Sequence, residues 1–217
     1  MAICYGSLLI LMDKSMWRDR ISGMTDIDII QKRFDEHARA VAVSAEHLAG
    51  RIERAVDIIV ESYRAGGGVF LFGNGGSAAD AQHIAGELVG RFLINRPALR
   101  AQALSTDTSV ITCVANDFSY EEIFSRQLEA NARPGDVAIG LSTSGDSPNV
   151  VRALRHARDH GLATVAFTKQ GGGQCADLAD VLLDIPAEAT PRVQEVGMVV
   201  YHILCELVEA KMANQKR

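Results

Sequence analysis

Hydrophobic residues in the first third of the chain recur at intervals of three and four positions, a spacing typical of amphipathic helices. The pattern runs over residues 26–63 and contains no proline. It is carried by Ile27, Ile30, Phe34, Ala38, Val41, Leu48, Ile52, Val56 and Ile59. This spacing predicts one long helix or two shorter ones, and Gly50 is the natural place for an interruption because glycine is a poor helix former.

The pattern changes after three consecutive glycines at positions 66–68. Residues 69–72 form a short continuous apolar run, which is typical of a strand buried on both faces. Similar runs follow at 101–104, 137–141, 163–167 and 181–185, and helical stretches lie between or after them at 78–91, 109–115, 120–130, 149–160, 174–180 and 191–212. The alternation predicts an α/β fold, a doubly wound parallel sheet of about five strands flanked by helices, with a helical N-terminal segment.

Composition indicates one ordinary globular domain. The chain has 217 residues, of which 47% are hydrophobic and 23% charged, enough to bury a substantial core. We predict a single domain over residues 24–217, with a helical lead-in over 24–65. The net charge of -5 and the scattered Lys and Arg residues argue against nucleic acid as a partner. A small-molecule partner is favoured.

The N-terminal residues carry little information. The apolar segment over residues 3–12 is too short to span a bilayer, and its charges follow it, the reverse of a signal peptide. We interpret residues 1–23 as an uninformative extension, and Met24 is a candidate natural start. Since the chain has no CxxC pair, its cysteines suggest neither a zinc knuckle nor a disulfide framework, but reduced thiols in a cytoplasmic protein. They are Cys4, Cys113, Cys175 and Cys205.

Two loops after predicted strands are suited to a phosphorylated ligand. The first is Gly73-Asn74-Gly75-Gly76-Ser77, which opens a helix where backbone N–H groups can hold an anion. Ser77 is expected to cap that helix or to donate to an oxygen. The loop is neither a Walker A sequence nor a dinucleotide fingerprint. A plain glycine turn is the alternative reading of this loop alone.

The second loop, Ser142-Thr143-Ser144-Gly145-Asp146-Ser147, follows the third predicted strand. Ser147 is the expected N-cap of the next helix, with Pro148 at its first position. Hydroxyl and N–H groups bind a phosphate without a Lys or Arg. Capping explains Ser147, but it does not explain the other three hydroxyls.

The succession of these two loops after strands is similar to the SIS domain family, in which the serine-rich loop holds the sugar phosphate. The resemblance covers nearly the whole chain from about Met24 onward. It implies the fold and a phosphosugar ligand. It does not by itself imply catalysis, because some SIS proteins are regulators and a fold alone does not fix a function.

Chemistry-bearing side chains stand on two predicted helices. His83 and Glu87 are four residues apart and share one helix face, where they can act on one ligand or form a surface ion pair. On the last helix, Gln194 and His202 lie roughly 80° apart around the axis. His202 stands in an otherwise apolar stretch, where a lone histidine is more often part of a core or an interface.

At these four positions the chain resembles the phosphoheptose isomerases. The resemblance implies one zinc ion per subunit, with Glu87 as catalytic base and His202 as catalytic acid. The implied metal ligands are His83, Glu87, Gln194 and His202. The implied substrate-binding residues are Asn74, Gly75, Gly76, Ser77, Glu87, Asn116, Asp117, Ser142, Thr143, Ser144, Ser147 and Gln194. Asn116-Asp117 is otherwise only a helix end and turn.

Two positions depart from the family pattern. Pro191 stands where some phosphoheptose isomerases carry an aspartate that touches the sugar, which puts a hydroxyl contact in doubt. Thr190 as N-cap with Pro191 at the first helical position is compatible with the helix. Gly197 stands where many carry a histidine, costs about 1 kcal/mol of helix stability against alanine, and is expected to mark close packing.

Interconversion of a ketose and an aldose needs one group that moves a carbon-bound proton and another that serves oxygen. A carboxylate and an imidazole can divide this work near neutral pH. Together with this chemistry, the resemblance to the phosphoheptose isomerases implies a cytoplasmic isomerase of sedoheptulose 7-phosphate, in the first step toward activated heptose for cell-surface lipopolysaccharide. The alternatives are a non-catalytic SIS regulator of DNA replication initiation and an isomerase of another phosphosugar. Apolar faces on the first and last helices predict subunit contacts, and the family implies a homotetramer with active sites between subunits.

Overall fold

The computed structural model describes residues 23–213, so the predictions for residues 1–22 and for Cys4 lie outside the described part. Helix α2 spans Asp26–Arg64. Its first turn is closed by a capping box, because the backbone N–H of Asp28 donates to Thr25 Oγ1 at 3.2 Å and the N–H of Thr25 donates to Asp28 Oδ2 at 2.9 Å.

Of the two predicted alternatives, the single long helix is the one that forms, with no interruption at Gly50. The helix passes through this residue because Leu48 and Ile52 on either side are buried and hold the backbone in place. The chain divides into two compact units within the same helix, one ending at Arg39 and the other comprising residues from Ala40 onward. The sheet and the candidate site belong to the second unit.

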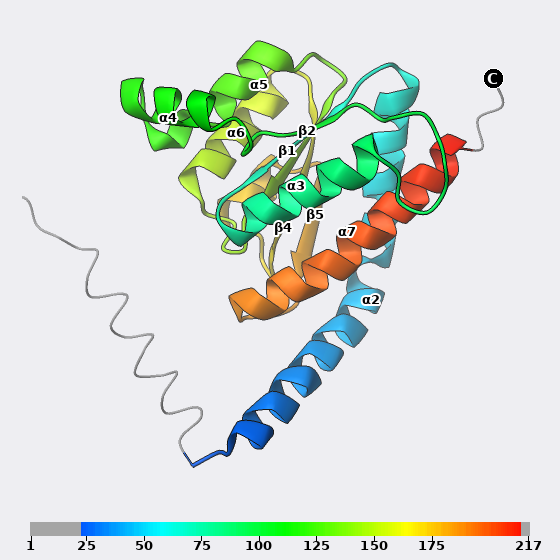
Figure 1. The fold of residues 1–217 in the computed structure, drawn as a ribbon, viewed down its shortest axis with the longest axis vertical. Helices are drawn as coiled ribbons and strands as arrows, with labels where there is room; N and C mark the ends of the chain where they lie inside the picture. Colours follow the sequence, from blue (N-terminus) through cyan, green and yellow to red (C-terminus); the bar gives the residue numbers. More distant parts are fainter. Residues whose placement is uncertain (1–22, 214–217) are drawn as a thin grey trace, which may run out of the picture. The chain divides into compact units, whose positions relative to one another are not determined.

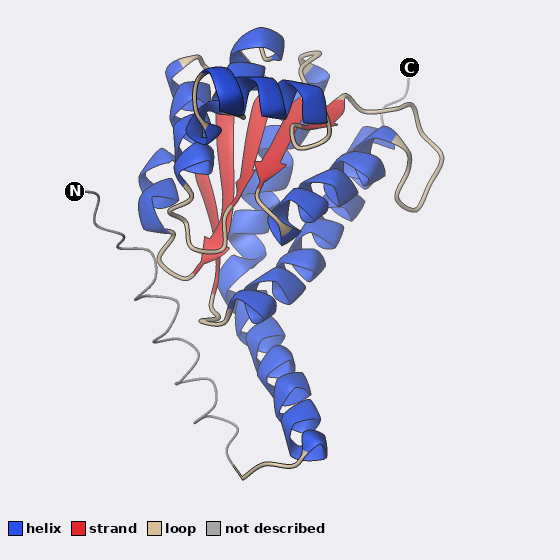
Figure 2. Cartoon of the chain, turned by 60° about the vertical axis from the view of Figure 1, so that its left-hand side comes forward, coloured by secondary structure: helices blue, strands red, loops and turns tan. Residues whose placement is uncertain are grey.

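The five predicted strands are present and form one parallel sheet (Figures 1 and 2). Their order is β2-β1-β3-β4-β5. They are β1 (Val69–Gly73), β2 (Ala101–Ala103), β3 (Val137–Leu141), β4 (Ala163–Lys169) and β5 (Val181–Ile185). The prediction of a doubly wound parallel sheet is confirmed.

The helices agree with the pattern except in two places. They are α3 (Gly76–Val89), α4 (Thr108–Asp117), α5 (Ser125–Asn131), α6 (Pro148–Asp159), α7 (Thr190–Ala213) and the 3-10 turns η1 (Tyr120–Glu122) and η2 (Gly173–Leu178). The helix expected over 120–130 breaks after η1, where the consecutive residues Ile123 and Phe124 both turn into the core. The helix expected over 174–180 is only a 3-10 turn, because the N–H of Cys175 bonds to Gly145 O at 3.0 Å.

Each face of the sheet has its own hydrophobic core. In β1, Val69 and Leu71 join a core with α2, α3 and α7, whereas Phe70 and Phe72 join a core with α4, α5 and α6. Figure 2 shows helices on both sides of the red strands. Burial on both faces explains the continuous apolar runs in the sequence. None of the helices in residues 23–213 is both long enough and apolar enough to cross a membrane.

The sheet brings the two polar loops together. β1 pairs with β3 in a register that places Gly73 opposite Leu141, so both loops leave the same edge from neighbouring strands. This edge, at the carboxyl ends of the strands, is where open α/β sheets bind ligands.

Candidate active site

The serine loop, residues 142–147, is organised around the buried Ser142 hydroxyl. This oxygen accepts the N–H groups of Gly145 at 3.2 Å and Ser147 at 3.4 Å, and it lies 2.9 Å from Ser147 Oγ and 3.4 Å from Ser144 Oγ. Ser147 is the N-cap of α6 and Pro148 opens the helix, as predicted. Ser147 forms no side-chain cap bond, since its hydroxyl pairs with Ser142 instead.

A third loop, after β4, supports the serine loop and was missed in the sequence. The N–H of Gln174 donates to Asp146 Oδ1 at 3.0 Å. Gly145 has φ +77°, and a Cβ there would collide with the backbone of Gly172. Position 145 therefore requires glycine for its backbone conformation and for the close approach of the two loops. The triple glycine at 171–173 was the available signal.

The first loop is fixed by asparagine pairing. Asn74 and Asn149 exchange two side-chain hydrogen bonds of 2.8 Å, and the Tyr120 hydroxyl donates to Asn74 Oδ1 at 3.1 Å. Asn74 therefore keeps one amide N–H for a ligand. Asn149 and Tyr120 were not identified from sequence. Of the two roles expected for Ser77, the capping of α3 does not occur, because Gly75 with φ +56° is the N-cap and Ser77 is buried within the first turn.

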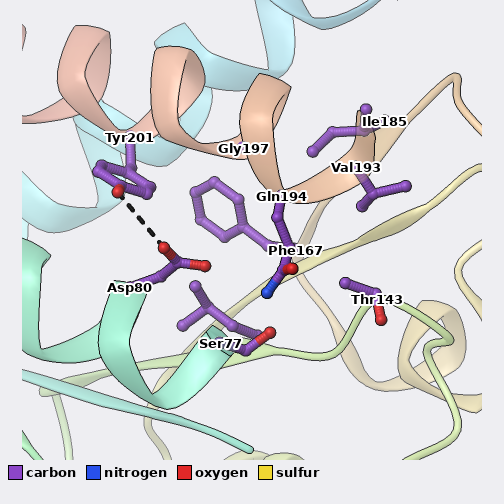
Figure 3. Close-up of a pocket in the computed structure, with 10 residues that line it drawn as sticks. Ser77, Asp80, Thr143, Phe167, Ile185, Val193, Gln194, Gly197 and Tyr201 are labelled. Carbon is purple, nitrogen blue, oxygen red and sulfur yellow. Dashed lines mark hydrogen bonds between the residues drawn. The ribbon is translucent and has the colours of Figure 1, made fainter. Parts of the chain in front are cut away.

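Gln194 reaches from α7 to this first loop. A Cβ at Gly76 would collide with the Gln194 amide, so the absence of a side chain at Gly76 makes room for it. Figure 3 shows Gln194 pointing between Ser77 and Thr143, in a pocket that also includes Asp80 and Tyr201. The remaining lining residues are Leu141, Phe167, Ile185, Val193 and Gly197. The pocket thus connects the serine loop with the facing surfaces of α3 and α7.

A cluster of three side chains forms where α3 meets α7. His83 Nε2 lies 3.2 Å from Glu87 Oε1 and 3.4 Å from His202 Nε2. The predicted shared face of His83 and Glu87 is confirmed, and His202 is brought to the same cluster. Gln194 contacts the first loop, so the structure does not place it with these three.

The donor atoms of this cluster are of the types that zinc binds, two imidazole nitrogens and a carboxylate oxygen. Ligands of a tetrahedral zinc ion with bonds of about 2.0–2.1 Å are about 3.3 Å apart, close to the two distances around His83. As the side chains stand, no group of three or more His, Cys, Asp or Glu residues within 23–213 could hold a metal ion. Donor chemistry fits zinc, and a closed site needs movement of these side chains.

Tyr201 contacts His83 of this cluster, and Asp80 in turn contacts Tyr201. The buried Tyr201 hydroxyl lies 3.1 Å from His83 Nδ1 and donates to Asp80 Oδ1 at 3.4 Å. Burial raises the pKa of Asp80, opposed by the hydrogen bond from Tyr201 and by His83, and burial also raises the pKa of Tyr201. In the sequence Tyr201 was only one member of an apolar stretch.

The segment after α3 is held by a buried carboxylate. Glu209 accepts the backbone N–H groups of Phe92, Leu93 and Ile94 at 2.8, 2.6 and 2.9 Å. Burial alone would raise the pKa of Glu209, but these three donors and Arg96 hold it below its usual value. The Phe92 ring then packs against His202, with centroids 5.6 Å apart.

Arg96 completes this support of the helix that carries Glu87. Its guanidinium donates to the carbonyl oxygens of Glu87 and Leu88, both at 2.7 Å, at the end of α3. Arg96 Nε lies 3.3 Å from Glu209 Oε1 without the alignment of a hydrogen bond. Glu209 and Arg96 therefore connect the ends of the helices that carry Glu87 and His202.

Other predicted residues lie apart from the pocket. Asn116 and Asp117 are exposed at the end of α4 and bond to each other at 2.8 Å, so their sugar contacts stay a prediction. α7 begins at Thr190, one residue before the predicted start. The expected close packing at Gly197 is wrong, because a Cβ there would meet Ile185 at 3.6 Å, an ordinary contact. The described cysteines, Cys113, Cys175 and Cys205, are free thiols.

Comparisons with known proteins agree with this geometry. The SIS domain family matches residues 33–169. The chain is 53% identical over 184 residues to a phosphoheptose isomerase of Paramagnetospirillum magneticum, a match that covers 85% of this chain and 96% of that protein.

Two solved structures are similar along most of the chain. They are the phosphoheptose isomerases of Neisseria gonorrhoeae (TM-score 0.81, 35% identity) and Francisella tularensis (TM-score 0.83, 32% identity), each covering 86% of this chain and 100% of the solved one. The chain therefore belongs to the SIS domain family and, within it, to the phosphoheptose isomerases.

Proposed function

We propose that this protein is an aldose-ketose isomerase that converts sedoheptulose 7-phosphate to D-glycero-D-manno-heptose 7-phosphate through an enediol. The observation that carries the proposal is the contact of His83 with both Glu87 and His202, beside a pocket that Thr143 of the serine loop lines. A regulator that only binds a phosphosugar has no need of this acid-base group. The family membership supports the same reading.

The serine loop is suited to the phosphate end of the substrate. Its Ser142 hydroxyl already holds two backbone N–H groups and two neighbouring hydroxyls in one small region. Preorganised donors of this kind bind a dianion at a helix N-terminus without a cationic side chain. In this arrangement the phosphate is fixed near α6, and the rest of the sugar extends along the pocket toward α3 and α7.

Glu87 and His202 would then divide the proton transfers. Glu87 removes a proton from C1 of the ketose, which gives the enediol, and returns it to C2. His202 gives a proton to the carbonyl oxygen on C2 and accepts the proton from the hydroxyl on C1. Proton gain and loss balance, so the product is an isomer of the substrate and no co-reactant is consumed.

We propose that His83, Glu87, His202 and Gln194 hold one zinc ion. Support comes from the donor types and from the two distances around His83. A bound zinc ion would polarise the substrate carbonyl and stabilise the enediolate, although a carboxylate bound to metal is a weaker base. Gln194 would have to turn away from Gly76 to join the other three.

A homotetramer with active sites between subunits is also proposed. α7 exposes four large apolar side chains to the extent of 37–43%, more than a monomer needs. They are Met198, Val199, Ile203 and Leu207. Light scattering of the purified protein should give four chains per particle, and a Leu207→Glu variant should give smaller particles. A monomeric wild type would contradict the proposal.

We expect the reaction to take place in the cytoplasm, as a first step toward the activated heptose of lipopolysaccharide. Expression of the chain in a bacterium that lacks its own enzyme should restore heptose in its lipopolysaccharide. The Glu87→Gln variant should not restore it.

The activity is tested by turnover of sedoheptulose 7-phosphate with added zinc and after chelation. Wild type should convert the substrate, and Glu87→Gln should lose roughly 100-fold or more in kcat because the amide cannot accept the carbon-bound proton. Glu61→Gln, an exposed change on α2, is the matched control and should retain activity. Failure of folded, zinc-loaded wild type to turn over would reject this substrate and favour another phosphosugar or the regulator.

A further inference from the structure

The Tyr201 hydroxyl occupies a position between two side chains of α3. It lies 3.1 Å from His83 Nδ1 and 3.4 Å from Asp80 Oδ1, and the tyrosine is only 1% exposed. Figure 3 shows Asp80 and the Tyr201 hydroxyl facing each other between the two helices. The His83 ring also meets the Tyr201 ring edge-on, with centroids 5.3 Å apart. Asp80, Tyr201 and His83 thus form a continuous series of polar contacts that ends at the cluster.

The chemistry of the three groups fixes the direction of the hydrogen bonds. An ionised carboxylate only accepts, so the hydrogen between Tyr201 and Asp80 must come from the tyrosine. A hydroxyl has one hydrogen, and its lone pairs are then the groups that face His83. His83 Nδ1 must therefore carry a hydrogen to complete the chain. The opposite direction would leave oxygen lone pairs of Tyr201 and Asp80 facing each other.

We propose that Tyr201 and Asp80 are positioning residues that hold His83 as its Nδ1–H tautomer, with a bare Nε2 directed toward Glu87 and His202. The bare nitrogen can accept the Nε2–H of His202 at 3.4 Å. Toward Glu87, at 3.2 Å, it presents a lone pair to a carboxylate oxygen, so without a cation this contact opposes the Nδ1–H tautomer, and the bonds of His83 with Tyr201 and His202 have to outweigh it. The second partner of a ligating histidine commonly sets its tautomer in this way.

The tautomer is tested directly, without any metal, by nitrogen NMR of the full chain labelled at histidine. A His83→Asn variant identifies the resonances. In wild type, near pH 8, the Nδ1 resonance of His83 should be that of a protonated nitrogen and the Nε2 resonance that of a bare one. In Tyr201→Phe both should move toward a mixture of tautomers. A protonated Nε2 in wild type, or an unchanged tautomer in the variant, would overturn the proposal.

A matched control is present in the same chain. The Tyr63 hydroxyl is buried and has no hydrogen-bond partner among the described residues, so Tyr63→Phe removes a tyrosine hydroxyl without breaking a hydrogen bond. It should leave the His83 resonances unchanged. Since both variants keep the aromatic ring, a general effect of packing should appear in both, whereas loss of the hydrogen bond should appear in Tyr201→Phe alone.

The consequence for the site rests on the proposed function and has its own measurement. Tyr201→Phe should weaken zinc binding about 10–100-fold in a chelator competition, as is typical for partners of ligating histidines, while Tyr63→Phe should not. At limiting zinc, kcat should fall with KM unchanged, and excess zinc should restore kcat. Asp80→Asn, which still accepts a hydrogen bond, should lose less affinity than Asp80→Ala.

The two measurements separate the possible failures. If wild type binds no zinc, the metal assignment fails and the NMR result alone decides the tautomer. If wild type binds zinc and Tyr201→Phe binds it equally well, the positioning role is rejected while the proposed function stands.

Discussion

The serine loop and the cluster around His83 belong to the same candidate site but are built in different ways. In the loop, Ser142 and Ser147 are five residues apart, and the Ser142 hydroxyl organises a single turn. In the cluster, His202 and His83 are 119 residues apart and meet only because α7 packs against α3. The loop is thus encoded locally, whereas the cluster depends on the tertiary structure.

Because of this difference, substitutions in the serine loop and in the cluster should have different effects. A change in the loop should alter phosphate binding and leave the chemical step largely intact. A change in the cluster should alter the chemical step, and so should a change in the residues that hold α3 and α7 together.

His202→Gln should have the largest effect, because it removes the group that serves oxygen in the proposed reaction. We expect kcat to fall by roughly 10²–10⁴-fold, with a much smaller change in KM. The matched control is His160→Gln on the exposed end of α6, which should retain activity. A rise in KM by a similar factor, without loss of kcat, would indicate that His202 binds substrate and does not move protons.

Glu209→Gln should destabilise the support of the cluster. The amide has one acceptor oxygen in place of two, so N–H groups of residues 92–94 lose partners and Arg96 loses its opposite charge. We expect the free energy of unfolding to fall by about 1.5–3 kcal/mol, measured by urea denaturation at neutral pH. A variant as stable as wild type would contradict the role given to Glu209.

The same group predicts a pH dependence. The pKa of Glu209 in the folded protein lies below its usual value of 4.5, so its contribution to stability is present above that value and is lost as the pH falls through the folded pKa. Wild type should therefore lose more stability than Glu209→Gln between neutral pH and the acid range. Parallel pH profiles for the two proteins would argue against this contribution.

Ser142→Ala should act on binding. The variant removes the oxygen that accepts two N–H groups and contacts two neighbouring hydroxyls. We expect KM for the phosphosugar to rise roughly 10–100-fold, with kcat changed much less, because each lost or misplaced donor costs about 1 kcal/mol or more. Ser109→Ala, an exposed change on α4, is the control. A fall in kcat without a rise in KM would contradict the prediction that the serine loop acts on binding and not on the chemical step.

The extent of sequence-based prediction follows the same division. The strands and the N-cap at Ser147 were predicted because short apolar runs and a Ser-Pro pair are local signals. Tyr201 was not identified, since its role depends on which side chains of α3 face it, and nothing in an apolar stretch reveals that. Ser77 does not cap α3 because Gly75, two residues earlier and with a positive φ, is the N-cap.

Residues that join elements were missed for the same physical reason. Asn149 and Glu209 look like ordinary helix residues in the sequence, and their partners lie 75 and 115–117 residues away. Gly50 shows the reverse case, in which a local helix-breaking signal is overridden by buried neighbours. Long-range packing decides both.

Two glycines, Gly76 and Gly197, line or contact the pocket that holds Gln194. Gly76→Ala places a Cβ against the Gln194 amide, so Gln194 must move. We expect a rise in KM of about tenfold, comparable with the loss of one or more binding contacts. Unchanged kinetics would show that the Gln194 side chain moves at no cost to binding.

Gly197→Ala should have the smallest effect and the opposite sign in stability. The residue is helical in α7, and its new Cβ would meet Ile185 Cδ1 at 3.6 Å, which requires no movement of the neighbour. Because alanine favours the helix over glycine by about 1 kcal/mol, the free energy of unfolding should rise by up to that amount, measured by urea denaturation. A loss of stability would mean that the space beside Gly197 is needed when chains assemble. The structure of α7 at this position would then depend on tertiary contacts, as in the cluster around His83, and not on local sequence, as in the serine loop.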